Sequence, residues 1–159
     1  MVHTERIVRD LELTYTGVFD LKEFLNLIKK FFGRYDYDLD EKQYDTKSKE
    51  DTNDTTIKWE FDRRLDDYNK GKVKLTIKIN NYTEAYLGEK RVVNGEINIK
   101  INGEMIRDYE EKWKRLPTRR FFRALYDQYI GKEREDIVTS SLKDMIESFR
   151  KEVKKYFKI

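Results

Sequence analysis

The amino-acid sequence predicts an α+β fold in which an antiparallel sheet packs against a long C-terminal helix. Apolar residues recur with helical spacing near the start and at the end of the chain. Between these two segments apolar and polar residues alternate, which is typical of strands with one buried face. Asn-Gly pairs within the alternating region indicate tight hairpin turns. The length of 159 residues fits one domain, 1–159.

The chain is expected to begin with a strand and a helix. Over residues 5–16 apolar residues alternate with polar ones, interrupted at Arg9, which predicts the strand. Asp20 can cap a helix at 21–32, and the glutamate three residues later completes a capping box. Gly33 is placed to end this helix, because glycine readily adopts the left-handed conformation found after a helix C-terminus.

Six further strands are predicted between the first helix and about residue 115. The polar segment 47–55 is expected to be a loop, and turns are expected at 69–71, 94–95 and 102–103, where Asn and Gly occur together. The alternating apolar residues of these strands include Tyr35, Tyr37, Leu39, Ile57, Trp59, Phe61, Val73, Leu75, Ile77, Ile79, Ile97, Ile99 and Ile101.

The end of the chain is predicted to be helical. A helix is expected at 118–130, with Thr118 as its N-cap, and a longer one at 133–158. Gly131 either separates the two helices or bends a single one. The apolar face of the longer helix consists of Val138, Leu142, Met145, Ile146, Phe149, Val153, Tyr156 and Phe157.

Composition argues against several kinds of site. The chain has no cysteine, so it holds neither a disulfide nor a thiolate metal site. Its one histidine, His3, lies in the N-terminal segment, and no glycine motif that cradles phosphate is present. We therefore expect no catalytic residue, no metal site and no cofactor.

The sequence also bears on location. No apolar run reaches the roughly 20 residues that span a bilayer, and the charged start, "MVHTERIVRDLE", is unlike a signal peptide. A cytoplasmic location is expected by default. Abundant Lys, Glu, Ile and Tyr favour a thermophilic source.

Three stretches carry a resemblance to a known fold: "FDLKEFLNLIKKFFG", the two Asn-Gly pairs and "SSLKDMIESFRKEVKKYFKI". In this order the elements resemble the helix-grip fold of the START and Bet v 1-like superfamily, over nearly the whole chain. The resemblance implies a curved antiparallel sheet of about seven strands that grips the last helix. A single first helix and an added helix at 118–130 depart from the family's pattern.

The resemblance implies a non-enzymatic protein that binds a hydrophobic or amphipathic small molecule between the sheet and the C-terminal helix. A strongly curved sheet is not filled by one helix, which leaves an apolar space for such a ligand. The alternative is that the apolar residues there form an ordinary core with no cavity. The candidate lining residues are Tyr37, Trp59, Phe61, Leu75, Ile77, Ile99, Met145 and Phe149.

A basic segment suggests a different function. Residues 71–159 carry 21 basic and 14 acidic side chains, against 13 and 17 in residues 1–70, and the densest basic stretch is 107–123. Such a stretch either binds nucleic acid or another acidic partner, or forms a solvated, salt-bridged face. The candidate anion-binding residues are Arg115, Arg119, Arg120 and Arg123.

Overall fold

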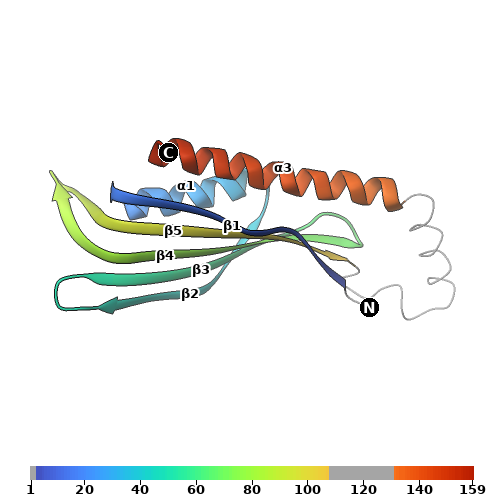
Figure 1. Cartoon of the computed structure of the whole chain (residues 1–159). Helices are drawn as coiled ribbons and strands as arrows, with labels where there is room; N and C mark the ends of the chain where they lie inside the picture. The colour runs from blue at the N-terminus through green and yellow to red at the C-terminus, as the bar shows by residue number, and fades with distance from the viewer. Residues whose placement is uncertain (1–2, 108–130) are drawn as a thin grey trace.

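The structure, a computed structural model, describes residues 3–107 and 131–159, and it is α+β as the sequence predicts (Figure 1). In the described ranges, one antiparallel sheet packs against two helices. In chain order the elements are β1 (His3–Phe19), α1 (Leu21–Arg34), β2 (Asp38–Ser48), β3 (Asn53–Arg64), β4 (Asn69–Leu87), β5 (Lys90–Arg107) and α3 (Gly131–Phe157).

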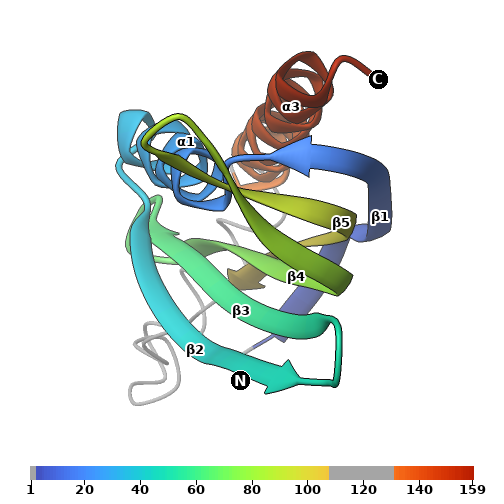
Figure 2. The same cartoon turned by 90° about the vertical axis from the view of Figure 1, so that its left-hand side faces the viewer.

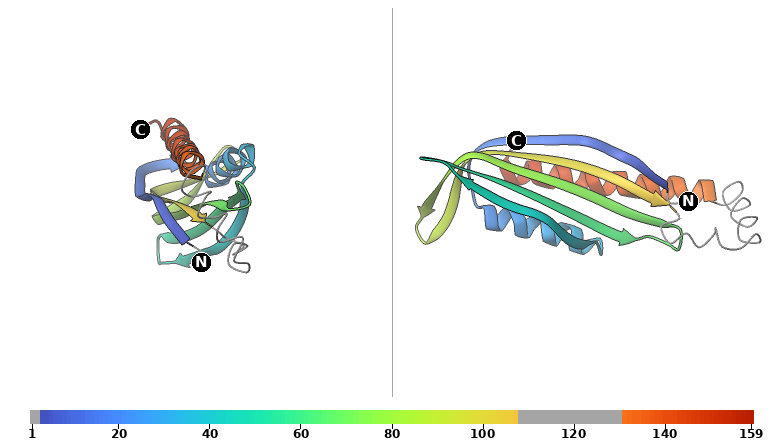
Figure 3. Two further views of the ribbon diagram at one scale, coloured as in Figure 1. Left: turned by 90° about the vertical axis from the view of Figure 1, so that its right-hand side faces the viewer. Right: turned by 90° about the horizontal axis from the view of Figure 1, so that it is seen from below.

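The strands follow the order β1-β5-β4-β3-β2 across the sheet, and every neighbouring pair is antiparallel. Strands β2 to β5 form successive hairpins, and β1 pairs with β5 at the far edge. Helix α1 therefore carries the chain from one edge strand of the sheet to the other. The views in Figures 1 and 3 agree that α1 and α3 lie on the same side of the sheet.

Alternation along the strands gives the sheet one apolar face, and both helices pack on it. The ring of Phe32 in α1 stacks on that of Phe61 in β3, with 4.2 Å between ring centroids. Phe157 at the end of α3 stacks on Tyr15 of β1 at 4.7 Å. Phe149 of α3 contacts Phe32 at 5.0 Å, so the two helices also pack on each other. Helix α1 covers the β3 side of this face and α3 covers the β1 side.

The described residues contain five strands, where about seven were expected. The difference arises because β4 and β5 are 19 and 18 residues long, and each contains residues that were expected to form turns. The Asn-Gly pairs at 94–95 and 102–103 lie inside β5. Gly103 lies directly under α3, and a Cβ at this position would meet the terminal methyl group of Ile146.

The true turns lie beside the expected ones. Strands β4 and β5 are joined at Gly88 and Glu89, and Gly88 has a φ of +68°. The turn before β4 precedes the expected segment 69–71, and the Asp66 carboxylate accepts the backbone N–H of Asn69 at 2.6 Å. The expected loop 47–55 shortens to residues 49–52.

Helix α1 begins as predicted and ends differently. Asp20 is its N-cap and accepts the backbone N–H of Glu23 at 3.1 Å. Gly33 lies within the helix, and Asp36 adopts the left-handed conformation instead, with a φ of +60°. The N–H groups of Asp36 and Tyr37 donate to carbonyl oxygens of the last turn at 3.1 and 3.0 Å, which is a Schellman motif.

Two other sequence predictions have clear outcomes. The interruption at Arg9 in the first strand corresponds to an irregularity in the pairing of β1 with β5, where Asp10 has a φ of +45°. The long C-terminal helix expected at 133–158 is α3, and its apolar face is buried against the sheet from Leu142 onward. The helix expected at 118–130 lies outside the described residues. Neither described helix is both long and apolar enough to cross a membrane.

Candidate binding groove between α1 and the β4–β5 hairpin

The end of the β4–β5 hairpin bends out of the plane of the sheet. The pairing register of the two strands shifts after Asn80, and Asn81 has a φ of +51°. The backbone N–H of Asn81 donates to Asp54 Oδ1 at 2.8 Å, which holds this conformation. Opposite the bend, a Cβ on Gly95 would lie 2.5 Å from Cβ of Tyr82. The bend therefore requires glycine, and Figure 2 shows the hairpin turned toward α1.

A groove of about 960 Å³ lies between α1 and this bent hairpin. We call it the α1–hairpin groove. One wall is the first half of α1, and the other is formed by the ends of β2 to β5. Its lining includes Leu21, Leu25 and Lys29 of α1, Tyr44 of β2, and Tyr82 and Val93 of the hairpin.

Apolar groups and hydroxyl groups share the wall of the groove. Tyr82 is buried, and its hydroxyl forms a hydrogen bond of 2.7 Å with Thr55 Oγ1, which in turn lies 2.9 Å from Thr46 Oγ1. Tyr44 is 48% exposed at the rim. Partial burial raises the pKa of Tyr44, so this hydroxyl stays neutral at physiological pH. The wall thus offers apolar and aromatic surface next to polar and charged side chains.

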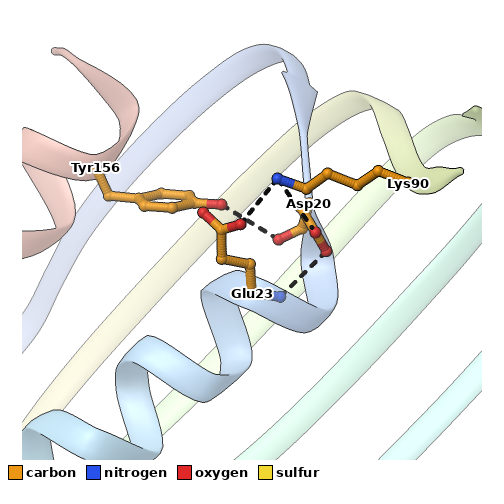
Figure 4. Close-up of polar contacts among 4 residues, drawn as sticks. All are labelled: Asp20, Glu23, Lys90 and Tyr156. Carbon is orange, nitrogen blue, oxygen red and sulfur yellow. Dashed lines mark hydrogen bonds and ion pairs between the residues drawn. The ribbon is translucent and has the colours of Figure 1, made fainter. Parts of the chain in front are cut away.

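A polar cluster joins three elements at the open end of the groove (Figure 4). Lys90 Nζ of β5 lies 2.9 Å from Glu23 Oε2 and 3.6 Å from Asp20 Oδ2 at the start of α1. The hydrogen bond with Glu23 is the main reason that the pKa of Lys90 is raised. The Tyr156 hydroxyl of α3 donates to the Asp20 carbonyl oxygen at 3.3 Å. We call these four residues the Lys90 cluster.

The Lys90 cluster links the hairpin to the start of α1, and the start of α1 to α3. Burial raises the pKa of Tyr156 to about 12, so its hydroxyl keeps its proton and remains a donor over the physiological range. Because one contact comes from the hairpin and another from α3, movement of the hairpin would break interactions with α1.

The positive charges on the groove wall differ in how they are paired. Arg91 forms an ion pair with Glu84, and Lys90 is held by Glu23. Lys29 has no carboxylate partner among the described residues, and its Nζ lies 5.3 Å from the centroid of the Trp59 ring. Within the described residues the indole N–H of Trp59 has no hydrogen-bond acceptor, although only 3% of this residue is exposed. Lys29 is therefore a cation of the groove wall without a carboxylate partner, and the ring of Trp59 lies behind it and does not line the groove.

A second, more open depression lies on the other flank of α1. It has a volume of about 810 Å³, and its lining includes Leu27 and Lys30 of α1 and Glu152 of α3. Arg34 Nη2 and Glu152 Oε2 form an ion pair at 2.9 Å there. Because it is more open to solvent, it encloses a small ligand less completely than the α1–hairpin groove does.

The eight residues predicted to line a ligand site are brought together in one buried core cluster. Rings from both helices pack among them: Phe61 stacks on Phe32, and Phe149 contacts Phe31 at 5.2 Å. None of the eight lines the α1–hairpin groove or the depression on the other flank of α1. Trp59 lies behind the groove wall, because Lys29, which lines the groove, covers its ring. A ligand among the eight residues stays a prediction.

The predicted anion-binding residues Arg115, Arg119, Arg120 and Arg123 lie outside the described residues. Arg107, at the start of that basic segment, is described, and its side chain is largely buried. Its guanidinium donates to Glu5 Oε2 at 2.6 Å, so this charge is used within the fold.

The groove residues were missed at the sequence level for a physical reason. Lys29 lies on the polar face of α1, which looks like an ordinary solvated helix surface. One signal was present: buried apolar positions in β4 are odd-numbered up to Ile79 and then shift to Tyr82. A change of parity within an alternating pattern indicates a bulge, and a bulge bends a strand.

The metal-ligating side chains are dispersed. Within residues 3–107 and 131–159, no group of three or more His, Cys, Asp or Glu is arranged to hold a metal ion. Comparison of the chain with protein-family models, with curated proteins and with solved structures found no match.

Proposed function

We propose that this chain is a non-enzymatic binding protein whose α1–hairpin groove takes an amphipathic small molecule. The observation that carries the proposal is the groove itself, a partly enclosed space of about 960 Å³ whose lining combines apolar and aromatic side chains with charged and polar ones. Sites for small molecules typically have volumes of about 300–1,000 Å³.

The lining suits a ligand with an apolar body. Leu21, Leu25 and Val93 present aliphatic surface, and Tyr82 presents a ring whose hydroxyl is already hydrogen-bonded to Thr55. Removing such surfaces from water provides most of the free energy of binding for an apolar group, about 25 cal/mol for each Å² buried. The charged residues at the rim, among them Arg91 and Glu84, favour a ligand whose other end is polar.

This proposal keeps the ligand class that the helix-grip resemblance implies and moves the site. In that fold the ligand would lie between the sheet and α3, where this chain has packed side chains such as Phe149 and Met145. The sheet here is covered by two helices, and α1 leaves a space toward the bent hairpin. A proposal centred on α1 therefore needs no rearrangement of the core.

Native mass spectrometry of the freshly purified protein tests the proposal directly, because a co-purifying molecule adds its mass to that of the chain. A matched pair of variants then locates the site with decanol as a neutral amphipathic probe. Leu25→Arg places a charge in the groove wall, whereas Leu27→Arg places the same charge on the other flank of α1.

We expect decanol to bind the native protein and Leu27→Arg alike, and to bind Leu25→Arg on the order of tenfold more weakly, since a charge on an apolar wall must be desolvated. Equal binding to both variants would place the ligand elsewhere. Absence of both a co-purifying molecule and decanol binding would end the proposal. Unchanged circular dichroism of the two variants is the control for folding.

A further inference from the structure

Resting on the proposed function, we infer that the apolar part of the ligand is a planar aromatic ring system, which lies against the tyrosine rings of the α1–hairpin groove. Its other face then contacts leucine side chains of α1. Two features of the groove lead to this ligand class. One wall is aromatic and the other aliphatic, and the two tyrosine rings have no ring partner among the described residues.

The wall formed by the strands is aromatic. Tyr44 of β2 and Tyr82 of the hairpin both line the groove. The Tyr82 hydroxyl is hydrogen-bonded to Thr55 Oγ1, which lies 2.9 Å from Thr46 Oγ1. Because Thr46 and Tyr44 are two residues apart in β2, their side chains lie on the same face of that strand. These contacts place the two tyrosines near each other on one wall.

The wall formed by α1 is aliphatic. Leu21 and Leu25 both line the groove, and they are four residues apart in the helix. Side chains with this spacing lie on the same side of a helix. A ligand in the groove therefore has tyrosine on one side and leucine on the other.

The two tyrosines also differ from most aromatic residues of the described chain. On the apolar face of the sheet, for example, the ring of Phe61 stacks on that of Phe32. Within the described ranges neither Tyr44 nor Tyr82 packs against another ring. Tyr44 is 48% exposed, so a large part of its side chain is accessible from the groove. An aromatic ligand would supply the ring partner that the fold does not.

A planar ring system gains more from this arrangement than an alkyl chain or a saturated ring does. Offset-stacked and edge-to-face contacts between aromatic rings are favourable beyond the burial of the same area. A saturated ring system with the same carbon skeleton is puckered and lacks these contacts, although it is the more apolar compound. Because burial alone would favour the saturated compound, a preference for the aromatic one indicates contacts between rings.

The experiment compares three neutral alcohols: naphthaleneethanol, its decahydro analogue with the same carbon skeleton, and decanol. Binding is measured by calorimetry for the native protein, Tyr44→Leu, Tyr44→Phe and Tyr86→Leu. Tyr44→Leu replaces the ring with an aliphatic side chain, whereas Tyr44→Phe keeps the ring. Tyr86 is the matched control, because it is an exposed tyrosine of β4 that does not line the groove.

We expect native protein to bind naphthaleneethanol on the order of tenfold more tightly than the decahydro analogue, as contacts with two rings allow. Tyr44→Leu should reduce this preference about threefold and should weaken naphthaleneethanol more than decanol. Tyr44→Phe and Tyr86→Leu should keep the preference. Leu25→Arg should weaken naphthaleneethanol and Leu27→Arg should not, because only Leu25 lines the groove.

The outcomes separate the inference from the proposed function. If decanol binds in the groove and naphthaleneethanol binds no more tightly than its decahydro analogue, the ligand class is wrong and the groove remains a binding site. The same holds if Tyr44→Leu and Tyr86→Leu behave alike, or if Tyr44→Phe loses the preference. If none of the three alcohols binds, the proposed function fails as well. The comparison of alcohols on native protein tests the inference even if a variant fails to fold.

Discussion

The two helices cover the sheet in different ways. Under α3, the side chains of Met145, Phe149 and Val153 are buried among strand residues and aromatic rings. Beside α1, the buried residues Phe24, Ile28 and Phe32 anchor the helix, while its flank toward the bent hairpin borders a groove of about 960 Å³.

The difference follows from what faces each helix. The C-terminal end of helix α3 lies against a part of β1 that pairs with β5 without a register shift, from Leu11 to Phe19. Helix α1 faces strands that shift register after Asn80 and bend. A regular sheet face can be filled completely by a helix with a continuous apolar stripe, whereas a bent hairpin beside a helix leaves a space. The α1–hairpin groove is thus made by the irregular end of the sheet.

The largest effect is expected from the α3 side. Phe149→Ala removes a fully buried ring that contacts both Phe31 and Phe32, and it should cost about 3–5 kcal/mol of unfolding free energy, because it leaves a cavity. Leu25→Ala on the groove wall should cost less, since that side chain is only partly buried. Chemical denaturation measures both. A loss below about 0.5 kcal/mol for Phe149→Ala would show that α3 does not pack as described.

A smaller effect is expected at the bend of the hairpin. Gly95→Ala would place a Cβ 2.5 Å from Cβ of Tyr82, and overpacking of this kind costs about 1–3 kcal/mol. The same substitution at Gly33 is the matched control, because a Cβ there meets nothing within 4 Å and the residue lies in a helix.

Gly33→Ala should stabilise the protein by about 0.5–1 kcal/mol, as alanine does in helices. Gly95→Ala should also weaken decanol binding, while Gly33→Ala should not. If Gly95→Ala were as stable as native protein and bound decanol equally well, the bend would not depend on this glycine.

The smallest effect on stability is expected from the Lys90 cluster. Lys90→Met removes the contacts of Lys90 with Glu23 and Asp20, which are exposed ion pairs and contribute little to the melting temperature. The amide protons of the hairpin end should nevertheless exchange faster with solvent, because the hairpin loses its contact with α1. Lys70→Met, which removes the 3.9 Å contact with Asp62 away from the groove, is the control. Equal exchange in native protein and Lys90→Met would show that other contacts hold the hairpin.

Much of the fold could be predicted from local patterns. The N-cap at Asp20, the apolar stripe of α3 and the alternation in β3 are all properties of short segments, and all three predictions are confirmed. The strand count was too high because Asn-Gly pairs were interpreted as turns. At Gly95 the glycine is required instead by the close approach of Tyr82, which lies in the neighbouring strand.

By itself, the sequence determined the class of fold, the two helices and the apolar face of the sheet, because each depends on the periodicity of neighbouring residues. Tertiary structure alone decided the groove. Lys29 lies on a helix surface that looks solvated in the sequence, and it meets Trp59 and the bent hairpin only when α1 has packed on β3. Contacts between segments so far apart in the chain leave no local pattern, so the candidate site could not be predicted although its scaffold could.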